Sequence, residues 1–245
     1  MKFRTILATA VAAVGVFAAS VPSFAGPVTF AQFSQTNPGA SFTFTNNTLS
    51  GNDLLLTATV PVDFKYLVPN GYGPVSTVIP ASLTMTGVVS ANAFTSAGFI
   101  FQPFSSITMN FTDIATSSNL LTVVTGTTGT LLGQPGSNSA VLNGDTGGGD
   151  TVTFTSDWLS FAGVLNEDFS LSFSGLNPTL AIQGAGANVH PGKLRTFTAA
   201  GTGTFGVETP DRGVPEPSPA LALLFGAAGL ALLFARNRKL AFRPM

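Results

Sequence analysis

An all-β fold is predicted by two features of the sequence: short segments in which apolar and hydroxyl side chains alternate, and turn-forming residues between those segments. Segment 41–45 (SFTFT) would place both phenylalanines on one face of a strand and the hydroxyl groups on the other. The same alternation recurs in segments 83–85, 107–111, 151–155 and 170–174. We therefore expect a single β-sandwich or jelly-roll domain of antiparallel strands. A right-handed β-solenoid is the alternative, although the threonine-containing segments show no fixed repeat period.

Turn-forming residues separate these segments, as in NPG at 37–39, NG at 70–71 and QPG at 134–136. Their spacing of about ten to twenty residues suits short antiparallel strands better than alternating strands and helices. Segment 126–150 is rich in Gly, Ser, Thr and Asn and is expected to form a long loop or hairpin on the surface.

The composition excludes several kinds of site. The chain has no cysteine, so disulfides, thiolate metal sites and a cysteine nucleophile are excluded. Between residues 26 and 213 there are ten acidic and four basic residues, a formal net charge of −6. An acidic domain without a basic cluster cannot neutralise phosphates, which argues against a nucleic acid as partner.

The N-terminal segment 1–25 is interpreted as a secretory signal peptide. Lys2 and Arg4 form a positive start, residues 6–19 an apolar core and residues 23–25 (SFA) a small-x-small cleavage site. Cleavage between Ala25 and Gly26 is therefore expected. A membrane-anchoring first helix is the alternative, but the apolar core is shorter than the ~20 residues that a span needs.

Three further segments are predicted to follow the β domain at 26–206. Segment 207–219 contains four prolines and is expected to be an extended linker. Segment 220–235 carries no charge, and as a helix it would span about 24 Å, slightly less than a ~30 Å hydrocarbon core. Segment 236–245 contains three arginines and one lysine, which the positive-inside rule places in the cytoplasm. A transmembrane helix at 220–235 is therefore predicted, and a buried helix of a globular domain is the alternative.

The C-terminal layout resembles a known sorting signal. Pro215, Glu216 and Pro217 are followed by the apolar segment 220–235 and then by the basic residues of 236–239. This order is similar to the PEP-CTERM signal on exported proteins of many Gram-negative bacteria. The resemblance implies recognition by an exosortase-type membrane enzyme that would cut near the motif. A sortase signal needs Leu-Pro-x-Thr-Gly, which is absent, and a GPI signal lacks a basic end.

The domain offers few candidates for catalysis or metal binding, and neither activity is predicted. His190 is the only histidine, and no Gly-x-Ser-x-Gly motif accompanies it. Glu167 and Asp168 are adjacent, so in a strand they would point to opposite faces and could not form one acid–base pair. Segment 143–150 places oxygen ligands on a glycine-rich loop, as Ca²⁺ requires, but matches neither the EF-hand nor the nonapeptide spacing. We therefore expect no cofactor.

Threonines at alternating positions would form rows of hydroxyl groups on the outer faces of strands. Some ice-binding proteins present threonine in this way, and ordinary outward faces of antiparallel strands look the same. The positions are 43/45, 57/59, 151/153/155 and 202/204.

A non-enzymatic protein is therefore expected, exported through the inner membrane, transiently anchored by its C-terminal helix, and then located at the cell surface or outside the cell. Its expected role is structural, adhesive or associated with exopolysaccharide. One alternative is a carbohydrate-active or other hydrolytic enzyme, for which Glu167 and Asp157 are the residues to test. The other is an ice-binding or carbohydrate-binding module with threonine-rich strands.

Overall fold

The computed structural model describes residues 27–37, 39–89, 91–126 and 129–209. The predicted all-β class is confirmed for these residues, whose only helical element is one short 3₁₀ turn, η1 (Thr146–Gly148). The strands are β1 (Val28–Gln35), β2 (Phe42–Thr45), β3 (Leu55–Tyr66), β4 (Ile79–Val89), β5 (Phe94–Ser96), β6 (Phe99–Asp113), β7 (Asn119–Thr125), β8 (Gly129–Gly133), β9 (Ser139–Asp145), β10 (Val152–Thr155), β11 (Asn166–Asn177) and β12 (Phe197–Glu208).

The predicted signal peptide 1–25, the helix 220–235 and the tail 236–245 lie outside the described residues, as does most of the linker. Within the described part of the chain, no helix is long and apolar enough to cross a membrane. Strand β12 continues to Glu208, so it includes the first two residues of the predicted linker 207–219.

All strands belong to one antiparallel sheet whose pairing returns to its starting point. The order β1, β3, β4, β6, β8, β9, β11 and β12 ends with β12 paired to β1. Strands β1 and β2 both lie between β12 and β3. Strand β1 pairs with the second half of β12 and of β3, and β2 pairs with the first half of each. Strands β7 and β10 extend the sheet from the second half of β6.

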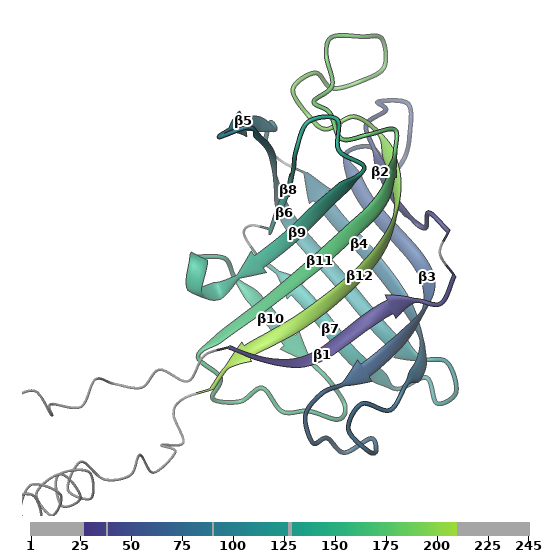
Figure 1. Cartoon of the computed structure of the whole chain (residues 1–245), viewed down its shortest axis with the longest axis vertical. Coiled ribbons are helices and arrows are strands. Elements are labelled where there is room, and N and C mark those ends of the chain that lie inside the picture. Colours follow the sequence, from purple (N-terminus) through teal and green to yellow (C-terminus); the bar gives the residue numbers. More distant parts are fainter. Residues whose placement is uncertain (1–26, 38, 90, 127–128, 210–245) are drawn as a thin grey trace, which may run out of the picture. The chain divides into compact units, whose positions relative to one another are not determined.

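The sheet folds into two layers that enclose the core. Strands β9, β11, β12 and β1 lie in front of β3, β4, β6 and β7, and the strands of the two layers run crosswise (Figure 1). Face-to-face packing of two layers is consistent with the predicted β-sandwich. The hydrogen bonding that joins the layers at both sides was not predicted.

Alternation of side chains explains why these segments are strands. In β2 the two phenylalanines are buried and the two threonines are half-buried, as predicted for segment 41–45. The predicted segments 83–85, 107–111 and 170–174 fall within β4, β6 and β11, and all but the first residue of segment 151–155 form β10. These strands therefore have one face in the core and one toward solvent.

Segment 126–150 is the main departure from the predicted elements. It contains the hairpin of β8 and β9, and both strands belong to the ring of paired strands rather than to a surface loop. Leu131 and Leu142 are fully buried and lie opposite each other in the ladder. Few apolar residues suffice here because only alternate positions face the core.

The core is unusually aromatic, and Phe205 on β12 lies at its centre. Its ring centroid is 5.4 Å from that of Phe111, 6.1 Å from those of Phe33 and Phe154, and 6.4 Å from that of Phe30. The pairs with Phe111 and Phe154 meet edge to face, the geometry in which the ring quadrupoles attract. Strands from both layers thus converge on one aromatic cluster.

Candidate functional site

The predicted processing residues cannot be placed in the fold. Ala25 and Gly26, and the motif Pro215, Glu216 and Pro217, lie outside the described residues. Cleavage and sorting at these positions therefore stay predictions.

His190 pairs with a carboxylate that is distant in the sequence. Its Nε2 lies 2.6 Å from Oδ2 of Asp53, on the connection between β2 and β3. The side chain of Asn46 is almost fully buried, accepts from the backbone N–H of His190 and donates to the carbonyls of His190 and Leu194. These contacts fasten the long loop before β12 to the end of β2.

Glu167 and Asp168 point to opposite faces of β11, as predicted. Glu167 faces inward, is 8% exposed, and accepts a 3.0 Å hydrogen bond from the backbone N–H of Phe154 on β10. Asp168 faces outward opposite Asp145 of β9. Burial raises the pKa of Asp168, and the charge of Asp145 raises it further. The carboxylate of Asp157 instead accepts from the backbone N–H of Asn119, so it does not share the partners of Glu167.

Glu167→Gln is expected to raise thermal stability at pH 7 and to flatten its dependence on pH. Burial raises the pKa of Glu167 above its ordinary value of 4.5, so the folded state binds this proton more tightly than the unfolded state. The contribution of this group to the free energy of unfolding is therefore complete below pH 4.5 and is lost as pH rises through the folded-state pKa. Glutamine carries no charge to desolvate, and its oxygen can still accept from Phe154. Tm measured from mildly acidic to mildly alkaline pH tests this.

Asp113→Asn is expected to change thermal stability in the opposite direction. Burial acts to raise the pKa of Asp113, but hydrogen bonds from the Thr116 hydroxyl, the Ala115 N–H and the Tyr72 hydroxyl lower it overall. The contribution of Asp113 to the free energy of unfolding is present above its ordinary pKa of 3.8 and is lost as pH falls. Asp113→Asn should therefore lower Tm at pH 7. If Glu167→Gln left both Tm and its dependence on pH unchanged, burial would not raise the pKa of Glu167 as described.

The glycine-rich segment 143–150, considered above for Ca²⁺, turns its carboxylates toward its own backbone. Asp145 Oδ1 accepts from the N–H of Gly147 at 2.7 Å, and Asp150 Oδ2 accepts from the N–H of Asp145 at 3.3 Å. Burial and the nearby charge of Asp145 raise the pKa of Asp150. Within the described residues, no group of three or more histidine, aspartate or glutamate side chains is arranged to hold a metal ion.

Threonines form two rows, the second interrupted by one asparagine, on the outer face of the layer that contains β3, β4 and β6. We call this surface the threonine face. The sequence indicated some of these residues, but only strand pairing brings them into register. The first row contains Thr198, Thr43, Thr57, Thr86 and Thr108 on β12, β2, β3, β4 and β6, and the second contains Thr59, Thr84, Asn110, Thr122 and Thr155 on β3, β4, β6, β7 and β10.

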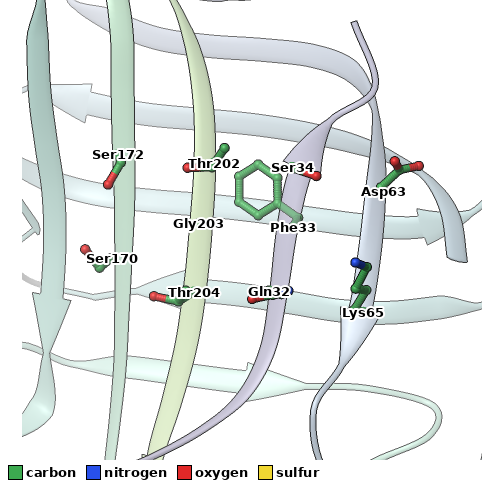
Figure 2. A pocket seen from close by; sticks show the side chains of 10 residues that line it. All are labelled: Gln32, Phe33, Ser34, Asp63, Lys65, Ser170, Ser172, Thr202, Gly203 and Thr204. Carbon is green, nitrogen blue, oxygen red and sulfur yellow. The ribbon is translucent and has the colours of Figure 1, made fainter. Parts of the chain in front are cut away.

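The other layer carries a shallow hollow on its outer face, which we call the outer depression. It encloses about 280 Å³ and lies over β11, β12, β1 and β3 (Figure 2). Phe33 and Gly203 also line it between its two rows of polar residues, but both face inward and the Phe33 side chain is only 3% exposed. One row contains Ser170, Thr204, Gln32 and Lys65, and the other contains Ser172, Thr202, Ser34 and Asp63.

Of the outer depression, sequence reasoning indicated Thr202 and Thr204 as a hydroxyl row, and Ser170 and Ser172 as polar positions of the alternating segment 170–174. The remaining residues are ordinary polar residues at alternating positions, and nothing in the sequence indicates that their strands are neighbours. No family model, no curated protein and no solved structure matches the chain.

Proposed function

We propose that the chain is an exported, non-enzymatic protein of the cell surface or extracellular matrix, associated with exopolysaccharide. In this proposal a signal peptide directs export, and an exosortase-type enzyme processes the PEP-CTERM signal after transient anchoring in the membrane. The β domain is then the working part of the mature protein.

The observation that supports this proposal best is the in-register arrangement of hydroxyl side chains on both outer faces of the β domain. The two rows of the threonine face contain no charged residue and extend across neighbouring strands. Threonine is stiff at χ1, so its hydroxyl and methyl groups are held at fixed positions. A repeated, uncharged surface of this kind suits contact with a hydrated polymer whose own hydroxyl groups also repeat.

The released protein is expected to sediment with the exopolysaccharide of the producing cells, and to do so equally at low and high salt. Contacts through uncharged hydroxyl groups are not screened by ions, whereas ion pairs on the surface are. Sedimentation and quantitative mass spectrometry of the matrix fraction measure the association. Mass spectrometry should also show mature ends near Gly26 and near the Pro215 to Pro217 motif. Protein found free of polysaccharide in the medium would overturn the proposal.

Ice binding is a second candidate, favoured specifically by the threonine rows. Antiparallel sheets twist, which works against contact with a flat crystal surface, whereas a polymer chain can follow a twisted face. Inhibition of ice recrystallisation by the parent protein, lost in a Thr84→Val, Thr86→Val variant, would favour ice over polysaccharide.

A further inference from the structure

The polar groups of the outer depression are available to a ligand. Its eight polar side chains are all exposed or half-buried. In the described part of the chain, none of them forms a hydrogen bond or ion pair with another residue. Serine and threonine side chains also lose little conformational entropy when a ligand fixes them. The depression therefore combines free hydrogen-bonding capacity with a surface that is largely preformed.

The charges of the depression indicate what kind of ligand it would accept. Asp63 and Lys65 are its only charged residues, and they lie two positions apart on the same face of β3. Their formal charges cancel at neutral pH. A ligand hydroxyl can donate to Asp63 and accept from Lys65, whereas an acidic group close to Asp63 would be repelled. This pattern favours a neutral polyhydroxylated ligand.

The arrangement of the polar groups also suits a sugar chain. Each polar row crosses four adjacent strands and spans about 14 Å, the length of a short oligosaccharide. Between the rows, the floor is the sheet backbone at Phe33 and Gly203, whose side-chain positions face the core. Hydroxyl groups project from both edges of a sugar ring, so a sugar chain that lies along the depression could reach both rows.

We infer that the outer depression is a binding site for a neutral oligosaccharide segment of a polysaccharide. The inference rests on the proposed function, for which it names the site and the chemical class of ligand. The site differs from the threonine face, which would contact a polymer broadly, because it contains a hollow and both signs of charge.

Isothermal titration calorimetry tests this with the full chain in a detergent that has no sugar headgroup. Neutral probes are cellohexaose and laminarihexaose, and hexagalacturonate is the acidic probe. At least one neutral probe should bind the parent, and hexagalacturonate should not. The variant Thr202→Val, Thr204→Val keeps the shape of the surface but removes two hydroxyl groups, and should weaken binding about tenfold.

The matched control is Thr48→Val, Thr95→Val, at two exposed threonines outside both the depression and the threonine face, which removes the same number of hydroxyl groups and should bind the probe like the parent. Asp63→Asn leaves Lys65 as the only charge and should allow hexagalacturonate to bind. Thermal unfolding verifies the fold of each variant, and Ser170→Ala, Ser172→Ala replaces the threonine variant if that variant does not fold.

The outcomes separate the site from the broader function. Failure of both neutral probes to bind, or equal binding by depression and control variants, overturns the inference. If the depression variant still sediments with exopolysaccharide as the parent does, the proposed function stands without this site. If the parent does not sediment at all while the neutral probe binds the depression, the binding site is supported and the proposed association with exopolysaccharide is contradicted.

Discussion

Replacing Pro215, Glu216 and Pro217 with alanine is expected to leave export intact and to hold the protein in the membrane fraction. The two parts of the C-terminal segment have separate physical roles in this prediction. Burial of apolar residues 220–235 in the bilayer would supply retention, because a helix satisfies its own backbone hydrogen bonds there. The proline-containing segment is expected to stay extended and accessible to a processing enzyme. Cell fractionation and immunoblotting of parent and variant measure the change, which should be close to complete.

Deletion of everything after Gly213 is the companion variant. It removes both the motif and the apolar segment, so the protein should cross the inner membrane without being retained or sorted. Release of the alanine variant as efficiently as the parent would mean that the motif is incidental. The chain would then be better described as a single-span membrane protein that faces outward.

Gly203→Ala is expected to destabilise the fold by about 2–3 kcal/mol, the upper range for overpacking a core. Gly203 faces the interior between Leu171 on β11 and Phe33 on β1, its cross-strand neighbours. A Cβ atom at this position would lie 2.4 Å from Leu171 Cδ2 and 2.5 Å from Phe33 Cε1. Both side chains are buried and fill the space that glycine leaves, so neither can move away freely. Chemical denaturation of parent and variant measures the loss.

Gly73→Ala is the matched control, because no heavy atom lies within 4 Å of a Cβ built there. Its free energy of unfolding should stay within about 0.5 kcal/mol of the parent. Leu171→Ala in the Gly203→Ala background should cost less than the sum of the two single changes, since the smaller side chain removes one clash. Equal losses for Gly203→Ala and Gly73→Ala would show that the interior is not packed around Gly203.

The sequence by itself predicted the all-β class and the direction of most side chains. Phe42 and Phe44 are buried, and Thr43 and Thr45 lie on the outer side, as their alternation indicates. Glu167 and Asp168 likewise point to opposite faces. These properties follow from the two-residue period of an extended backbone, which is local and needs no knowledge of the neighbouring strands.

Only the tertiary structure decided which strands are neighbours. Strand β1 pairs with β12, so Val28 lies opposite Val207. The hairpin of β8 and β9 was not predicted to belong to the ring, because its Gly- and Ser-rich composition is also typical of loops. Its strand character depends on partners elsewhere in the chain.

Both candidate surfaces depend on this long-range pairing. The outer depression combines residues from β1, β3, β11 and β12, and the threonine face combines rows from strands across the whole domain. Alternation determines that these side chains face outward, but not which of them stand side by side. Register is determined by burying every inner face in one shared core, and that requirement involves the whole chain at once.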